Sequence, residues 1–348
     1  MYCILRFLIR NLVYNIFVGG INNMKKNILT IFLASTIGLC TIIPLAGCSQ
    51  SNLSESDNVS IEQNGDKENE SSEKKSNLVK PSYTSLNYSN LVDEETQNEV
   101  KQILEKSGIK AEYVNNYFDL IKDYNKLYAS DLENTSGFST TNKSQVPYDE
   151  GELSNKWMES KKYLDSNCRV SSFMLFRDFV VSDGSKFDED MYNIAQDLAV
   201  IDENSLVNNT NFTDSNIEAF EKIFSIINID KFGSDEEVAE IIKNTWEKRG
   251  VKFSEDKDVT LISGFMKNED TKDTFIGHAG ISIKNGNEIL FIEKYSPAMP
   301  FQVTKFKNKE EVRSYMYDRL TTTIGEGTGT GPDILVMEND ILMNEDRM

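Results

Sequence analysis

FIGHAGISIKNGNEILFIEKY, residues 275–295, is the stretch of the sequence that decides the fold class. Its two halves are apolar or alternate apolar with polar residues, as β-strands do. Between them lies Asn285-Gly286, the strongest short signal for a tight hairpin turn. We therefore predict two antiparallel strands joined at this turn, with His278 on the first strand and Glu293 on the second.

Further strands and helices surround this hairpin in a simple order along the chain. The predicted strands are 259–266, 275–283, 289–295 and 333–337, with a helix at 309–320 before the last. Upstream, apolar residues recur at helical spacing in 93–106, 113–128, 154–164, 168–180, 188–200, 214–228 and 235–249. Ser234 and Glu237 match a capping box at the start of the last of these helices. Helices followed by a mainly antiparallel sheet are typical of the α+β class.

Composition limits what this chain of 348 residues can bind. With 39% hydrophobic and 27% charged residues, it can bury a sizeable core. A formal net charge of -19 argues against a nucleic-acid partner, because little could neutralise a phosphate backbone. Four cysteines are too few for a disulfide scaffold, and one histidine excludes a multi-histidine metal site. We expect no metal and no cofactor, since the glycine-rich stretch 325–331 follows a helix, the reverse of a phosphate-binding loop.

MKKNILTIFLASTIGLCTIIPLAGC, residues 24–48, has the pattern of a secretory signal: two lysines, an apolar run and small residues before a cleavage point. Its end, Leu-Ala-Gly-Cys, resembles the bacterial lipoprotein signal, in which the cysteine becomes the lipidated first residue. We therefore predict a signal peptide over 1–47, with the true start at Met24, and a lipid on Cys48. A transmembrane anchor is disfavoured, because the apolar run is short for a span and a polar segment follows it.

Residues 48–80 are mainly Ser, Asn, Glu, Asp, Gln and Lys. Such a composition buries too little apolar surface to fold, so we predict a disordered tether that begins at the lipidated cysteine. The folded body then divides into a helical N-terminal part, 81–150, and a second domain, 151–348. These features predict an extracytoplasmic protein that is anchored to the cell membrane by the lipid on Cys48.

Cys168 is the one cysteine outside the predicted signal peptide and lipidation site. Asn167 is a good N-cap, which places Cys168 in the first turn of a helix. A thiol there faces unpaired backbone N–H groups and the positive end of the helix dipole, and both lower its pKa. A nucleophilic cysteine needs this environment. The alternative is that Cys168 is a small buried hydrophobic residue, as a lone cysteine in an apolar helix usually is.

His278 is the only histidine of the chain. An imidazole is the base that best activates a thiol near neutral pH. A third polar group must then hold the other ring nitrogen and fix its tautomer. Glu293 and Gln302 are both candidates, and we favour Glu293 because the adjacent strand is the usual place for this group. The alternative for His278 is a surface residue or one that is satisfied in the core.

Two of these segments resemble motifs of the NlpC-like cell-wall hydrolases, which have a papain-like fold. Residues 167–173, NCRVSSF, are similar to the segment in which Asp-Cys-Ser-Gly opens a helix. Residues 278–286, HAGISIKNG, are similar to the hairpin in which His-Val-Gly-Ile leads to an Asn-Gly turn. The resemblance covers about 154–305 and implies a cysteine nucleophile on a helix and a histidine base on a strand. The sequence departs from this pattern at Arg169, which replaces a small residue, and at Glu293, which replaces His, Asn or Gln.

The chain is also identified as a member of a family of bacterial lipoproteins catalogued as domain of unknown function 4300. The stretches that carry this resemblance are Asn167-Cys168-Arg169, His278-Ala279-Gly280, Phe291-Ile292-Glu293-Lys294, Pro300-Phe301-Gln302 and Glu338-Asn339-Asp340. The family would cover most of residues 85–345. Its function is not established, so the resemblance adds no chemistry of its own.

These observations predict a cysteine hydrolase with a papain-like domain over 151–348. Cys168 would be the nucleophile, His278 the base and then the acid, and backbone N–H groups at the helix start would stabilise the oxyanion. Glu293 or Gln302 would orient the histidine. By resemblance, the substrate is an amide in cell-wall peptide, cleaved through a thioester; the acidic body leaves a small or cationic peptide open. The alternatives are a non-catalytic lipoprotein that binds a ligand or partner, and a thiol acyltransferase.

Overall fold

The computed structural model describes residues 82–344, except 143–145, 147, 186, 188, 190, 211, 257 and 326–333. The predicted signal peptide with its start at Met24, the lipidated Cys48, the tether and most of the glycine-rich stretch lie outside the described residues. Among the described residues, none of the helices is both long and apolar enough to cross a membrane.

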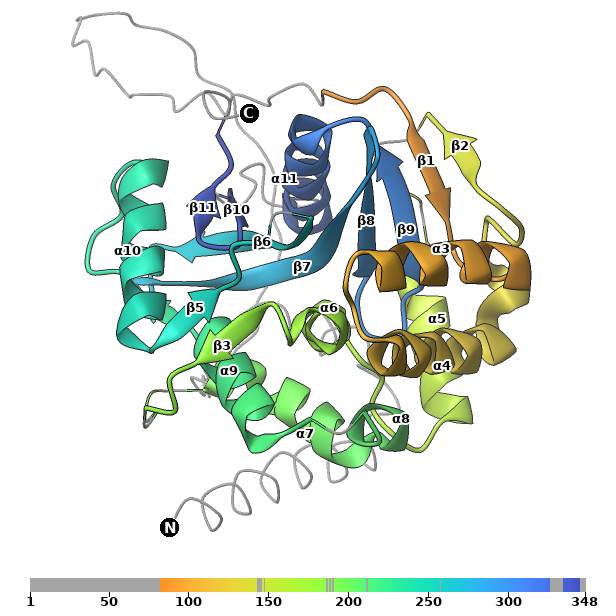
Figure 1. Ribbon diagram of the computed structural model, residues 1–348, viewed down its shortest axis with the longest axis horizontal. Helices are drawn as coiled ribbons and strands as arrows, with labels where there is room; N and C mark the ends of the chain where they lie inside the picture. The colour runs from red at the N-terminus through yellow and green to blue at the C-terminus, as the bar shows by residue number, and fades with distance from the viewer. Residues whose placement is uncertain are drawn as a thin grey trace, which may run out of the picture.

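An antiparallel sheet forms the centre of the described part of the chain (Figure 1). Its strand order is β11–β10–β6–β7–β8–β9–β1–β2, and β4 pairs with β7 off this path. The strands are β1 (Leu86–Ser89), β2 (Ser139–Thr141), β4 (Ile227–Asn228), β6 (Val259–Asn268), β7 (Asp273–Asn285), β8 (Glu288–Lys294), β9 (Phe301–Phe306), β10 (Ile334–Glu338) and β11 (Ile341–Leu342). Helices and an antiparallel sheet in one chain confirm the predicted α+β class.

The predicted hairpin joins β7 and β8. Asn285 pairs with Glu288, so the two central turn residues are Gly286 and Asn287, one position later than an Asn-Gly turn would have them. Gly286 has a φ of +63°, a conformation that glycine adopts without steric cost at the first central position of such a turn.

Helices cover both faces of the sheet (Figure 1). On one face, α11 (Lys309–Gly325) contributes Tyr315 to a buried cluster that includes Phe291 of β8. On the other face, α6 (Cys168–Phe176) packs against β7 and β8, and Ile292 belongs to a second, larger cluster there. Alternate residues of a strand point to opposite faces, so the neighbours Phe291 and Ile292 lie in different clusters.

The other predicted helices are present with shifted ends. They are α3 (Glu94–Lys106), α4 (Ala111–Tyr128), α5 (Glu150–Ser160), α7 (Ala195–Glu203), α9 (Asp214–Phe224) and α10 (Asp235–Lys248). A short helix that was not predicted, α8 (Ser205–Asn208), follows α7. Both halves of the predicted capping box at Ser234 and Glu237 are formed, which confirms it. The helix predicted from 154 begins at Glu150 instead, because Asp149 caps it by accepting a hydrogen bond from the backbone of Glu152.

Two predicted helices have wrong boundaries where the chain changes direction. The helix predicted to reach residue 180 ends at Phe176, because β3 (Val180–Ser182) pairs with β5 (Val251–Phe253) in a separate small sheet. The helix predicted over 188–200 is displaced: a 3₁₀ turn leads into α7, and the side chain of Asn204 then caps α8.

β9 has no counterpart among the predicted strands. Its sequence, FQVTKF, alternates, but Gln302 and Thr304 are polar and fully buried. These side chains hydrogen-bond to each other at 2.9 Å inside the protein. Polar residues that are satisfied in the core do not give the apolar signal by which a strand is recognised.

The first described strand belongs to the same sheet as the hairpin. β1 pairs with β9 on one side and with β2 on the other. Residues 86–89 therefore reach the strand that carries Gln302, next to the strand that carries Glu293.

Candidate active site

Cys168 is the first residue of α6. The side chain of Asn167 caps this helix by accepting a hydrogen bond from the backbone N–H of Val170 at 3.0 Å, as predicted. Ser172, one turn further on, donates to the carbonyl of Ala279 on β7 at 3.2 Å. The start of α6 is thus held against the strand that carries His278. The thiol itself is buried, with 6% of the residue exposed.

A β-bulge directs His278. Gly264 on β6 pairs with His278, but the next residue, Phe265, pairs with Ile276, so Gly277 is extra. A β-bulge re-aims the side chain that follows it. A Cβ at Gly277 would lie 2.4 Å from the sulfur of Met266, so a larger residue there would displace the Met266 side chain. The bulge with the present packing of Met266 therefore favours glycine immediately before His278.

Glu293 is the residue that contacts the His278 ring. Its Oε2 lies 2.5 Å from Nε2 of His278, and both residues are buried. Gln302 lies behind Glu293 on the neighbouring strand: its Nε2 is 3.4 Å from Oε1 of Glu293, and its register partner is Glu293. Of the two candidates for the orienting group, Glu293 therefore contacts the imidazole ring, and Gln302 contacts Glu293.

Two residues of α11 complete this cluster. The hydroxyl of Tyr315 donates to Oε1 of Glu293 at 2.5 Å. Nε of Arg319 lies 3.3 Å from Oε2 of Glu293 and 3.2 Å from Nε2 of His278. Neither residue was predicted from the sequence. The sequence does contain one indication of them. Tyr315 and Arg319 are four residues apart in a helix, so they lie on the same helix face, which is the buried one.

The charges around Cys168 favour its thiolate. Burial raises the pKa of the thiol, but the charge of His278, a hydrogen bond with its ring and the charge of Arg169 outweigh burial. The pKa of Cys168 is therefore below that of an ordinary thiol. Burial lowers the pKa of His278, as does the charge of Arg319, but the interactions with Cys168 and Glu293 raise it more. The lowered pKa of the thiol and the raised pKa of the imidazole both favour a thiolate–imidazolium pair.

Glu293 is ionised in this arrangement. Burial raises the pKa of its carboxyl, but the charge of Arg319, the contact with His278 and the hydrogen bond from Tyr315 lower it more, and the net shift is downward. A carboxylate with a donor at each oxygen is able to hold the protonated imidazole in place.

Arg169, the residue in which the sequence departs from the hydrolase motif, links three elements. Its Nε pairs with Asp197 of α7 at 2.7 Å, and its Nη1 donates to the carbonyl of Ile276 at 3.1 Å. Asp197 also accepts a hydrogen bond from the side chain of Asn167. The residues before and after Cys168 are thus both held by one buried carboxylate.

A second buried ion pair lies between the segment before Cys168 and the strand of Glu293. Lys294 pairs with Asp165 at 2.8 Å and donates to the carbonyl of Met299 at 2.6 Å. Asp165 also accepts from the backbone N–H of Ala298 at 3.0 Å, where φ is +61°, a rare value for a residue with a Cβ. The pair thus fixes the loop between β8 and β9 beside the segment that leads to Cys168.

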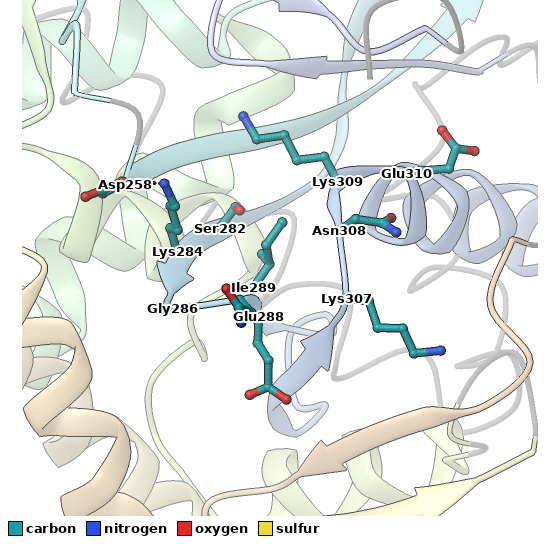
Figure 2. A pocket seen from close by; sticks show the side chains of 11 residues that line it. Asp258, Ser282, Lys284, Gly286, Glu288, Ile289, Lys307, Asn308, Lys309 and Glu310 are labelled. Carbon is teal, nitrogen blue, oxygen red and sulfur yellow. Dashed lines mark ion pairs between the residues drawn. The ribbon is translucent and has the colours of Figure 1, made fainter.

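No group of three or more metal-ligating side chains is found among the described residues. A hollow of about 550 Å³ lies at the β7–β8 turn and the start of α11 (Figure 2). It is lined by Asp258, Ser282, Lys284, Gly286, Asn287, Glu288, Ile289, Lys307, Asn308, Lys309 and Glu310. It contains none of Cys168, His278 and Glu293, and two of its lysines pair with Asp258 and with Glu338.

The fold and the site together define an α+β protein with a buried Cys–His–Glu cluster between a helix start and an antiparallel sheet. A family model described as Domain of unknown function (DUF4300) matches residues 87–343, and the chain belongs to this family. The match spans β1 to the residue after β11, so it includes every residue of the cluster. No curated protein and no solved structure matches the chain.

Proposed function

We propose that this protein is a membrane-anchored, extracytoplasmic cysteine hydrolase with a papain-like domain, which cleaves an amide bond in a peptide. The observation that carries the proposal is the line of hydrogen bonds from Cys168 through His278 to Glu293, all of it buried. A thiol at a helix start, a base against it and a carboxylate behind the base are the parts that nucleophilic catalysis requires. The lipid on Cys48 would place this site outside the cell membrane.

The proposed reaction begins with the thiolate of Cys168 and the imidazolium of His278. The sulfur attacks the carbonyl carbon of the amide, and a C–S bond forms. As the tetrahedral intermediate collapses, the C–N bond breaks and the leaving nitrogen takes the proton of the imidazolium, which yields a thioester and neutral His278. Water then attacks the thioester and gives a proton to the imidazole. The C–S bond breaks, and a carboxylic acid and the starting ion pair result.

The charged residues define the substrate only as a class. By its resemblance to the NlpC-like hydrolases, the protein would act on an amide in cell-wall peptide. The formal net charge of -19 disfavours approach to anionic wall polymers. A short or cationic peptide is therefore the substrate class that fits this acidic protein best.

A second function is favoured by one observation, the low exposure of Cys168. Only 6% of the residue is exposed, and the hollow of Figure 2 does not reach it. A lipoprotein that binds a ligand or partner on an inactive fold needs no access to the thiol. A hydrolase, in contrast, needs the segments around Cys168 to open for its substrate.

Alkylation of Cys168 separates these two functions. The full chain is treated with iodoacetamide from pH 5 to pH 9, and mass spectrometry of the Cys168 peptide distinguishes this site from Cys3, Cys40 and Cys48. The hydrolase predicts fast labelling near pH 6 that slows in His278→Ala. Labelling that rises only near the free-thiol pKa of about 8.5, with or without His278, contradicts it and favours the binding protein. Turnover of peptidoglycan fragments, abolished in Cys168→Ala, is the second requirement.

A further inference from the structure

Arg319 contacts both His278, the proposed base, and Glu293, the residue that orients His278. Its Nε is 3.2 Å from Nε2 of His278 and 3.3 Å from Oε2 of Glu293. The rest of the guanidinium is fixed by two other contacts. Nη2 donates to the carbonyl of Tyr295 at 2.5 Å, and the guanidinium carbon lies 3.0 Å from the centre of the Tyr295 ring. A planar guanidinium held on an aromatic face has little freedom to turn away.

Nε2 of His278 lies against Glu293 and Arg319, which leaves Nδ1 as the ring nitrogen that exchanges a proton with the thiol and the leaving nitrogen. Nε2 keeps its proton and donates it to Glu293, and the N–H of Arg319 is directed to the same carboxylate oxygen. The positive charge of Arg319 disfavours the imidazolium, whereas the negative charge of Glu293 favours it. Arg319 and Glu293 therefore act on the charge of the ring in opposite directions.

We propose that Arg319 is a positioning residue of this site, which acts through His278 and Glu293 by stabilising the imidazole that has given up its proton. The proposal rests on the proposed hydrolase reaction, in which His278 must release a proton to the leaving nitrogen. The negative charges of Glu293 and Cys168 on the two sides of the ring stabilise the imidazolium and so weaken it as an acid. Arg319 supplies the opposing charge.

The charged groups that surround His278 come from every element packed against it. They are Cys168 and Arg169 on or next to the start of α6, Glu293 on β8, and Tyr315 and Arg319 on α11. On β6, the partner of His278 is Gly264, which carries no charge. Arg319 is thus the cation that faces the ring from the side of Glu293, and its removal leaves Glu293 without an ion-pair partner other than His278.

The chain has one histidine, so the protonation of His278 can be measured directly. The full chain is labelled with ¹⁵N- and ¹³C-histidine, and its single imidazole signal is followed by NMR against pH in the wild type, Arg319→Gln and Arg319→Lys. We expect the titration midpoint of His278 to rise by about one pH unit or more in Arg319→Gln, because a neighbouring charge is lost. Arg319→Lys keeps the charge without the fixed N–H, so we expect a smaller rise.

Arg313→Gln is the matched control. It removes an arginine from the same helix, where Nε of Arg313 donates to the carbonyl of Met343 and the guanidinium lies 3.5 Å from Glu310. A midpoint in Arg319→Gln that equals those of the wild type and of Arg313→Gln would overturn the proposal. If Arg319→Gln does not fold, as judged by circular dichroism, an unchanged midpoint in Arg319→Lys overturns it instead.

The titration also separates this inference from the proposed function. It needs no substrate, so a protein that cleaves nothing but shows the rise confirms the role of Arg319 at the ring and refutes only the hydrolase. A protein that hydrolyses a peptide but shows no rise refutes the role of Arg319 alone. In the second case the pH dependence of turnover in Arg319→Lys would match that of the wild type.

Discussion

The carboxylate of Asp197 and the guanidinium of Arg169 form a buried ion pair of 2.7 Å beside Cys168. The same carboxylate accepts a hydrogen bond from Asn167, the cap of α6, and the same guanidinium donates to the carbonyl of Ile276, just before the bulge of β7. One pair therefore fixes the helix start that presents the thiol relative to the strand that presents the imidazole. Their relative placement is what a thiolate–imidazolium pair requires.

We predict that Asp197→Ala lowers the free energy of unfolding by about 3–5 kcal/mol, because it leaves the buried charge of Arg169 without its partner. It also slows alkylation of Cys168 near pH 6, since Asn167 loses its acceptor and the helix start is released. Urea denaturation and peptide-resolved mass spectrometry measure the two effects. Asp178→Ala is the matched control: it breaks an ion pair with Lys110 of the same 2.7 Å length at the surface. Equal losses in the two variants would refute the prediction.

The hydroxyl of Tyr315 is predicted to keep Glu293 ionised. Tyr315→Phe retains the ring, which contacts Phe291 and Phe306 in the core. It removes the donor to Oε1 of Glu293 and an acceptor of Gln302. We expect a loss of about 1.5–3 kcal/mol in stability, the usual value for a hydrogen bond to a charged group, and a higher pKa for Glu293. Tyr83→Phe, in the same cluster, removes a hydroxyl that bonds Asp318 in a half-buried place. An equal loss there would show that the effect is not specific to Glu293.

The dependence of stability on pH tests the ionisation of Glu293. Its pKa in the folded protein is lowered, so its charge stabilises the fold above the unfolded value of about 4.3, and this contribution disappears as pH falls through the folded pKa. The difference in unfolding free energy between wild type and Glu293→Gln is therefore largest near pH 6 and shrinks in acid. Urea denaturation from pH 3.5 to pH 6.5 measures it. A difference that stays constant over this range contradicts the lowered pKa.

Glu99→Gln provides the control for that titration. Glu99 pairs with Lys305 at 3.2 Å on the surface, where half of the carboxylate side chain is exposed. Solvent and salt screen such a pair, so we expect a small difference from wild type at every pH.

The sequence predicted the parts of the site that have a local pattern. Asn167 before Cys168 is a capping signal, and the hairpin turn places His278 and Glu293 on neighbouring strands whatever the rest of the chain does. The structure bears out both local features. The choice between Glu293 and Gln302 was left open because both lie on strands beyond His278, and only the register shows that Gln302 pairs with Glu293.

The residues that were missed depend on contacts between distant parts of the chain. Arg319 and Tyr315 belong to a helix whose buried face includes polar side chains, and an apolar period does not reveal such a face. Asp197 stands between Gln196 and Leu198, and nothing in these neighbours distinguishes it from an exposed carboxylate. Its burial follows from Arg169, which is 28 residues away. Long-range pairs of this kind have no signal in a single sequence.

The final prediction concerns the buried pair of Lys294 and Asp165, which holds the loop between β8 and β9. Lys294 is surrounded by the rings of Tyr124 and Phe301 and donates to Met299, so it has no access to water that would replace its partner. Lys294→Met leaves Asp165 with backbone donors only, and we expect a loss of about 3–5 kcal/mol in stability. Asp165→Asn leaves the ammonium without a counter-charge and should be similarly destabilised.

The double variant decides whether the two charges act as a pair. If they do, Lys294→Met combined with Asp165→Asn loses less free energy of unfolding than the sum of the single variants, because the second change removes a charge that the first left unpaired. Urea denaturation of the four proteins gives this coupling energy. The same proteins report on the site. Lys294→Met removes the donor to the carbonyl of Met299, and Asp165→Asn removes the charged acceptor of the Ala298 N–H. Each single variant therefore releases the neighbouring loop, and alkylation of Cys168 should be faster. Additive losses, with unchanged alkylation, would mean that the loop is held by its apolar contacts and that the pair does not control access to the thiol.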